Sequence, residues 1–517
     1  TATPTPSPTP TPPSEGPRRG GVLKLAQPGD PTSCDLGSWR GRDYRSVHTC
    51  NPMLNQLVQV DPHDHARVLP DLAASWEVDD EGTRWTFHLE RGVRWHDGAP
   101  FTAADVVFTY RRALEPPPGF EVGRTAPLAL YVEAVEAPDD HTVVVRTKFP
   151  AASFLGNAAS VYASIYPRHL LQGRQPPSVD AFDATVGTGP FRPAAFTRDA
   201  VYQLRRWEGY FRPGRPYLDE VWYVTIPNDA VRFAALKARE VDAVPIGITE
   251  GQAQELRRDF AARVAVLEVA TANFIAVTLN TQRPPFDDPR VRLAVDLALD
   301  RQAAAQVQGG GAAGAYLPPG GAWALPAEVV AGLSGLGDKA AERERARALL
   351  AEAGHGDGLS VPLLARTGGY FQGIAAFVQG QLASVGVQAE LESLDTAAYF
   401  DRLARRDFAL TASSSSLTLD DPDEAFGQRY LCDAPENYAG LCDPVLDGLF
   451  GQQQRALDPE ARRFLVERMQ RQLWGHHAYL VVLWTLRRTP VWDGVHGFVM
   501  GASNYQGMRL EDVWKEG

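Results

Sequence analysis

The sequence lacks the features that identify several large classes of protein. Its longest apolar run near the C-terminus, Ala478 to Trp484, is far shorter than the ~20 residues that a helix needs to cross a bilayer. Lysine and arginine total 51 against 63 aspartates and glutamates, which gives a net charge of -12, and no basic stripe is present. Binding to nucleic acid or to anionic lipid heads needs a positive surface, so this balance argues against both.

Catalytic signatures are also missing. The sequence contains no G-x-S-x-G elbow, no H-E-x-x-H and no Walker A loop. In Gly187-Thr-Gly-Pro190, the proline removes a backbone N–H that a phosphate loop would need, so we interpret this run as a structural turn. The adjacent His476 and His477 face different directions, and the acidic cluster at 420–424 lacks the glycine and distal glutamate of a calcium loop. We therefore predict no catalytic residue, cofactor or metal site, and interpret the cluster as a negative surface turn.

Only four cysteines are present, in two local pairs: Cys34 with Cys50, and Cys432 with Cys442. An even number of cysteines at short spacing is typical of proteins in an oxidising compartment, where disulfide bonds form and persist. Three connectivities are possible; we favour the local one, with four free core thiols as the alternative. Closing a loop of roughly 10–15 residues contributes ~3 kcal/mol in the chain-entropy model.

The N-terminal residues 1–18 alternate threonine, serine and proline with almost no apolar content. We expect a disordered tether, extended by its prolines, such as would begin a mature exported protein. Beyond it, helical periodicity and β-branched strands interleave along the whole chain, which favours an α/β class.

A long segment runs from Leu69-Pro-Asp-Leu-Ala-Ala-Ser-Trp76 through Trp95-His-Asp-Gly98 to Tyr110. It closely resembles the signature region of the family 5 extracellular solute-binding proteins, the peptide, dipeptide and nickel receptors of ABC importers. Later blocks follow in the order of that family, and the resemblance covers nearly everything after residue 20. These blocks are Val186–Phe191, Tyr210–Val244, Leu279–Val295, Ala346–Gly354 and Gly380–Val387.

The resemblance implies an α/β, two-lobed fold like that of periplasmic binding proteins, of the large type II kind. Lobe I would comprise residues 19–272, with an extra subdomain at about 61–180, and residues 486–517 would return to it. Lobe II would comprise residues 273–485. Two crossover strands, near Val269 and Leu483, would form the hinge, and closure would engulf the ligand.

The resemblance also indicates ligand-binding residues. In peptide-binding relatives an aspartate shortly before a D-P-D sequence pairs with the peptide ammonium group; here that position is Thr418, and Asp420 is close but off register. A threonine offers only a hydroxyl, which argues against recognition of a free amino terminus. Arg366 lies at or beside an arginine that pairs with a carboxylate in dipeptide binders, and the loop closed by Cys432–Cys442 resembles a disulfide loop near their pocket.

Other candidate contacts are polar or aromatic. The serine run could hydrogen-bond a ligand, and loop aromatics could stack on it. Each candidate has a structural alternative: an exposed loop arginine at 366, a flexible serine loop, and aromatic side chains that only pack. These further candidates are Ser415, Ser416, Trp39, Trp323, Tyr370 and Tyr505.

These observations together predict a monomeric extracellular or periplasmic receptor that is not an enzyme. It would be a lipoprotein anchored to the outer face of the cell membrane through its N-terminal tether alone. It would capture a small ligand, a peptide or related oligomer, and deliver it to ABC transporter permease subunits. The alternatives are an oligosaccharide or other non-peptide solute, a sensor subunit, or a hydrolase on the same scaffold.

Overall fold

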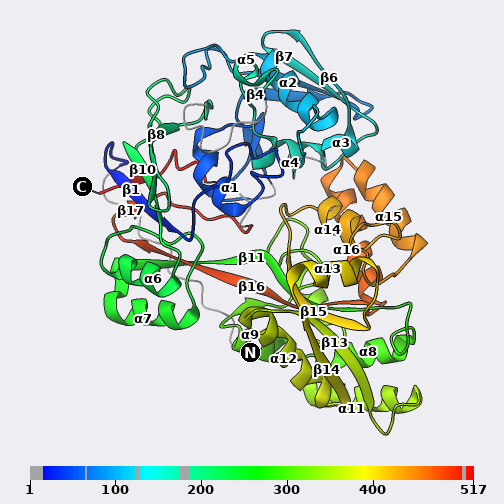
Figure 1. The fold of residues 1–517 in the computed structure, drawn as a ribbon. Coiled ribbons are helices and arrows are strands. Elements are labelled where there is room, and N and C mark those ends of the chain that lie inside the picture. The colour runs from blue at the N-terminus through cyan, green and yellow to red at the C-terminus, as the bar shows by residue number, and fades with distance from the viewer. Residues whose placement is uncertain (1–15, 65–66, 124–127, 175–184, 504–507, 517) are drawn as a thin grey trace.

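In the computed structural model, described residues 16–64, 67–123, 128–174, 185–503 and 508–516 form two bodies (Figure 1). We call residues 16–263 and 493–516 the N-terminal body, and residues 280–478 the inserted body. Two long antiparallel strands, β11 (Val264–Leu279) and β16 (Tyr479–Trp492), run from one body to the other. They include the two positions at which crossover strands were predicted. Most of the predicted tether, residues 1–15, lies outside the described residues.

The N-terminal body contains a four-stranded sheet in the order β1-β10-β9-β8. Its first pair is parallel and the others are antiparallel. The C-terminal tail returns to this sheet: Leu510 and Val513 are buried in the same core as Leu23 and Leu25. The elements here are β1 (Val22–Gln27), α1 (Tyr44–Cys50), β8 (Phe191–Thr197), β9 (Val201–Arg206), β10 (Glu220–Thr225), α6 (Asp229–Lys237), α7 (Glu250–Phe260), β17 (Val495–His496) and β18 (Trp514–Lys515).

A second four-stranded sheet of the N-terminal body, β4-β5-β7-β6, is entirely antiparallel. Alternation along β5 buries Trp85, Phe87 and Leu89 against α2, whose first turn is closed by a capping box between Thr102 and Asp105. The elements are β2 (Val58–Val60), β3 (Val68–Pro70), β4 (Ala73–Val78), β5 (Arg84–Leu89), α2 (Ala103–Leu114), α3 (Leu128–Tyr131), β6 (Val132–Asp139), β7 (Thr142–Thr147), α4 (Phe154–Ala158) and α5 (Arg168–Leu171).

The inserted body is built on a six-stranded sheet in the order β12-β16-β11-β15-β13-β14. Helices α8, α11 and α12 pack on it, and α14 to α16 form a separate apolar cluster with Phe274 and Trp484 of the long strands. The elements are α8 (Pro289–Ala298), α9 (Arg301–Val307), β12 (Gly311–Ala312), α10 (Ala327–Ala331), α11 (Lys339–Glu352), β13 (Leu359–Arg366), α12 (Gly369–Ala383), β14 (Val387–Leu394), α13 (Thr396–Ala404), β15 (Leu410–Ser416), α14 (Pro422–Arg429), α15 (Pro444–Arg455) and α16 (Pro459–Trp474).

Candidate ligand-binding site

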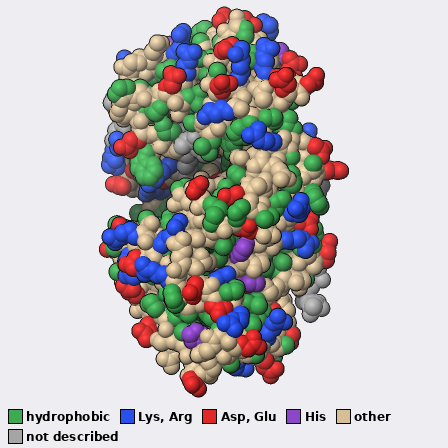
Figure 2. Space-filling model, turned by 90° about the vertical axis from the view of Figure 1, so that its right-hand side faces the viewer, with side chains coloured by type: hydrophobic (Ala, Val, Ile, Leu, Met, Phe, Trp, Pro, Cys, Tyr) green, Lys and Arg blue, Asp and Glu red, His purple; other side chains and the backbone are tan. Residues whose placement is uncertain are grey.

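A cavity of about 2060 Å³ lies between the two bodies, and both contribute to its wall. Figure 2 shows the surface hollowed between the upper and lower parts of the molecule. The N-terminal body contributes Trp39 and Tyr44 near α1 and Tyr131 at the end of α3. The inserted body contributes the end of β15 and the segments that follow β13 and β15.

The serine run predicted to contact ligand forms part of this wall. Ser413–Ser416 end strand β15, which pairs with β11 on one side and with β13 on the other. Ser415 and Ser416 therefore lie on a hydrogen-bonded strand, not on a flexible loop, and both line the cavity. Their hydroxyl groups supply neutral donors and acceptors.

Arg366, at the end of β13, also lines the cavity. Its guanidinium group donates to the Ser413 hydroxyl (3.1 Å) and the Ser414 carbonyl (3.3 Å), and lies 3.7 Å from the centroid of the Phe371 ring. Its Nε is buried without a hydrogen-bond partner, and among the described residues the guanidinium forms no ion pair. Burial lowers the pKa of Arg366, so an anion beside it would favour its charged form.

Aromatic side chains face the cavity from both bodies. Trp39 is 48% exposed, with the Arg42 guanidinium over its ring, and Tyr370 at the start of α12 is 49% exposed. Sequence reasoning missed Tyr399 and Phe400 of α13, which also line the wall. The position of α13 depends on long-range packing, which local patterns do not reveal.

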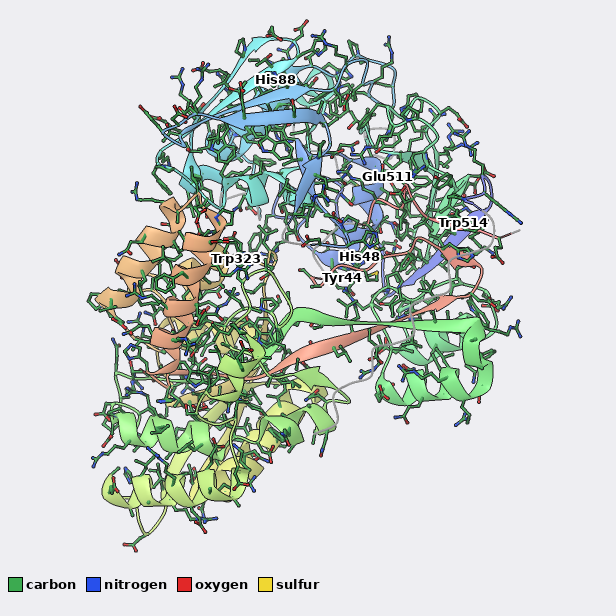
Figure 3. The ribbon with its side chains drawn as sticks, turned by 180° about the vertical axis from the view of Figure 1, so that it is seen from behind. Tyr44, His48, His88, Trp323, Glu511 and Trp514 are labelled. Atoms are coloured by element: carbon green, nitrogen blue, oxygen red, sulfur yellow. A yellow bond between two sulfur atoms is a disulfide. The ribbon has the colours of Figure 1, made fainter. Side chains whose placement is uncertain are left out.

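Of the four other predicted contacts, only Thr418 is found among the described residues of the cavity wall. Thr418 lines the cavity, and its backbone N–H donates to the Glu424 carboxylate (2.7 Å). Asp420 is not part of the wall: it accepts the Ala322 backbone N–H (2.8 Å), and burial raises its pKa to about 7. Trp323 is also absent from the wall and packs beside α16, as Figure 3 shows. Tyr505 lies outside the described residues.

The interpretation of the acidic cluster as a surface turn is wrong, because its central carboxylates are buried where the two bodies meet. Asp421 accepts hydrogen bonds from the Ser153 hydroxyl (2.7 Å) and from Arg462 (3.2 Å). Asp423 accepts from the Tyr131 hydroxyl (2.7 Å), and its pKa is raised by burial and by the charge of Asp421. We call Tyr131, Ser153, Asp421, Asp423 and Arg462 the polar junction.

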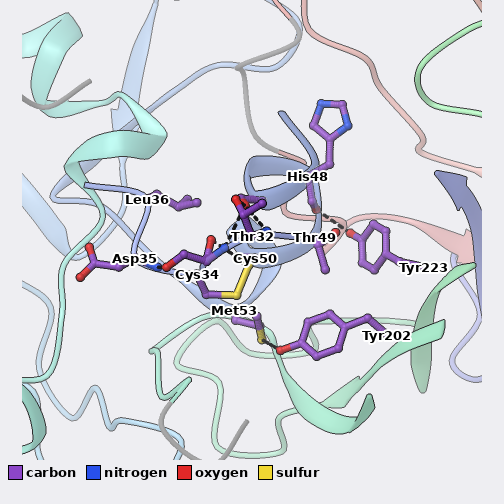
Figure 4. The surroundings of a disulfide bond; sticks show 12 residues. Thr32, Cys34, Asp35, Leu36, His48, Thr49, Cys50, Met53, Tyr202 and Tyr223 are labelled. Carbon is purple, nitrogen blue, oxygen red and sulfur yellow. Dashed lines mark hydrogen bonds between the residues drawn. A yellow bond between two sulfur atoms is a disulfide. The ribbon is translucent and has the colours of Figure 1, made fainter. Parts of the chain in front are cut away.

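Both local disulfides are present, so the alternative of four free thiols is wrong. Cys34–Cys50 joins α1 to the segment before it and is buried, as Figure 4 shows with the nearby Tyr223 hydroxyl donating to the His48 carbonyl. Cys432–Cys442 closes a loop whose Pro435, Glu436 and Tyr438 line the cavity.

Within the described parts of the chain, no three His, Cys, Asp or Glu side chains gather as a metal ion would require. His476 contacts Asp443 and His477 contacts Asp296, so the adjacent histidines have separate partners. Every helix among the described residues is too short or too polar to span a bilayer.

Known proteins share both the sequence pattern and the fold. The chain is 29% identical over 490 residues to the probable di/tripeptide-binding protein 5 of Pseudomonas aeruginosa, covering 87% of this chain and 89% of that protein. It is 28% identical over 492 residues to the dipeptide-binding protein of Escherichia coli, covering 89% of each.

Solved structures superpose along almost the whole chain. HbpA2 from Haemophilus parasuis matches with a TM-score of 0.84 at 22% identity, over 96% of this chain and 100% of that one. AgaA from A. tumefaciens, in complex with agropinic acid, matches with a TM-score of 0.72 at 26% identity, over 96% and 99%. These matches confirm the predicted α/β fold of periplasmic binding proteins. Because residues 67–437 match the family described as bacterial extracellular solute-binding proteins, family 5, the chain belongs to that family of binding proteins.

Proposed function

We propose that this protein captures a peptide or related oligomer between its two bodies and delivers it to an ABC transporter permease. The observation that carries the proposal is the cavity of about 2060 Å³, whose wall is shared by two bodies that two long strands connect. A solute that contacts both walls binds the closed arrangement more tightly than the open one. Binding therefore shifts the equilibrium toward closure.

We extend the proposal to the residues of the cavity wall that would contact the ligand. Arg366 would receive an acidic group of the ligand, since no described carboxylate pairs with its guanidinium. Ser415, Ser416 and Thr418 would hydrogen-bond the ligand backbone, while Trp39 and Tyr370 would pack on its side chains from opposite walls. Relatives named for dipeptides and di/tripeptides support a peptide as the solute class.

The lobe boundaries and membrane attachment are part of the proposal. Lobe I would be residues 19–272 with 486–517, and lobe II residues 273–485, so that β11 and β16 serve as the hinge. The Thr/Pro-rich residues 1–18 would tether lobe I to a lipid anchor on the outer face of the membrane. The tether would keep the receptor close to its permease.

The test measures both the binding of a peptide and the change in the radius of gyration that it causes. Titration calorimetry with Met-Leu and with Ser-Thr-Ser-Ala, peptides bound by two solved relatives, would detect capture. Small-angle X-ray scattering of the same samples would detect closure as a smaller radius of gyration. Binding accompanied by compaction is expected. If neither peptide binds with its amino end free or acetylated, or if binding leaves the radius of gyration unchanged, the proposal is wrong.

A further inference from the structure

The charged side chains of the cavity wall differ in how their charges are balanced. Among the described lining residues, five are carboxylates and three are guanidinium groups. A ligand that enters the cavity loses water and must find its charge partners in this set. The carboxylates are Asp43, Asp421, Asp423, Glu424 and Glu436, and the guanidinium groups are Arg42, Arg366 and Arg429.

Four of the carboxylates are paired with arginine, and Asp423 shares Arg462 (3.6 Å) with Asp421. Asp43 accepts from Arg45 Nε (3.0 Å), and its position as the N-cap of α1 adds backbone donors. Asp421 accepts from Arg462 (3.2 Å) in the polar junction, and Glu436 lies 3.1 Å from Arg429 Nε. An arginine of the protein therefore already lies beside each of these four carboxylates.

Asp423 and the fifth carboxylate, Glu424, also accept hydrogen bonds from uncharged donors at the start of α14. Asp423 accepts from the Tyr131 hydroxyl (2.7 Å) and from Gln454 Nε2 (3.1 Å). Glu424 accepts the backbone N–H groups of Thr418 and Leu419, each at 2.7 Å. Both lie in the first turn of the helix, where the helix dipole stabilises negative charge.

Arg366 is the exception. Its guanidinium group donates to the neutral hydroxyl of Ser413 and the carbonyl of Ser414, and its Nε is buried without a partner. No carboxylate of the described residues forms an ion pair with it. A partly buried guanidinium group binds a carboxylate or a similar planar anion through two parallel hydrogen bonds. Arg366 therefore provides a positive charge in the wall that an acidic group of the ligand can pair with.

We propose that the cavity selects solutes that carry an acidic group and lack a free ammonium group, such as peptides whose amino end is blocked. An ammonium group gains little here, because each carboxylate of the wall already lies beside an arginine or accepts hydrogen bonds from the protein, and the desolvation of the ammonium group is poorly compensated. The neutral hydroxyl groups of Ser415, Ser416 and Thr418 suit an amide instead. This inference rests on the proposed function and names its solute class.

The experiment uses three matched probes: Met-Leu, N-acetyl-Met-Leu and N-acetyl-Met-Leu amide. Calorimetry at neutral pH should show the acetylated acid binding at least about tenfold more tightly than either other probe, since each of those mismatches one charge. Arg366→Met should remove the preference for the acid over the amide. Arg283→Met is the control, because Arg283 lies outside the cavity and pairs with Asp407 (3.0 Å).

Thr418→Asp adds the reverse test. A carboxylate placed at this position of the wall should raise the affinity for Met-Leu relative to its acetylated form, with circular dichroism verifying the fold. If wild-type protein binds Met-Leu as tightly as N-acetyl-Met-Leu, the inference is overturned while the proposed function stands. Equal binding of acid and amide would also overturn it. If none of the probes binds, the peptide proposal itself fails.

Discussion

Replacing Ser153 with alanine would remove the hydroxyl group that links the two bodies in the polar junction. Ser153 is 1% exposed, donates to Asp421 (2.7 Å) and accepts from Arg462 (2.6 Å). Hydrogen bonds to charged groups contribute about 1.5–3 kcal/mol each, but Asp421 and Arg462 still pair directly at 3.2 Å after the change. We therefore expect a net loss of about 2 kcal/mol, or roughly thirtyfold, in the equilibrium between joined and separated bodies.

Small-angle X-ray scattering of the ligand-free protein would measure this shift as a larger radius of gyration for Ser153→Ala. Ser164→Ala is the matched control: Ser164 is fully buried and also makes two hydrogen bonds, to Val161 and Gln56, but both lie within the N-terminal body. The control should lower the melting temperature without expanding the molecule. Equal radii for the two variants would refute the role assigned to the polar junction.

Three further predictions concern stability. Reducing Cys34–Cys50 and Cys432–Cys442, which span 16 and 10 residues, should lower the free energy of unfolding by about 3 kcal/mol per bond in the chain-entropy model, and with it the melting temperature. An unchanged melting curve with all thiols labelled would contradict this. Burial lowers the pKa of His96 from 6.5 to about 4, so the folded protein binds a proton at this side chain less readily than the unfolded chain does. The free energy of unfolding should therefore fall as the pH drops from about 6.5 to 4. Urea titrations across this pH range should show a smaller fall for His96→Gln. Gly187→Ala would place Cβ 1.8 Å from the Met53 carbonyl oxygen and should cost about 3 kcal/mol, whereas the control Gly156→Ala meets no atom within 4 Å and should not.

Local structure could be predicted where neighbours along the chain decide it. Thr102 and Asp105 form the capping box that starts α2, and the alternation of Trp85 and Phe87 buries one face of β5. The local disulfides followed from short spacing. In each case the relevant partner lies within about sixteen residues, where sequence patterns carry information.

The cavity wall could be predicted only in part. Arg366 was predicted through a family resemblance and the serines through the hydrogen-bonding capacity of their hydroxyl groups, whereas the acidic cluster was misinterpreted because its partners are remote. Asp421 is 268 residues from Ser153, and Asp423 is 292 residues from Tyr131. A run of acids with no such partners would be solvated at the surface, so only the tertiary fold distinguishes the two cases.

The return of the C-terminal tail has a consequence for biosynthesis. Leu510 and Val513 complete the core that Leu23 and Leu25 begin, and Lys515 donates to the Val22 carbonyl (2.8 Å). The N-terminal body therefore cannot finish folding until residues 510–515 have been made, whereas the core residues of the inserted body, which run no further than Trp484, are all made earlier. Protein truncated after Arg509 should keep a protease-resistant inserted body beside an incomplete, protease-sensitive N-terminal body.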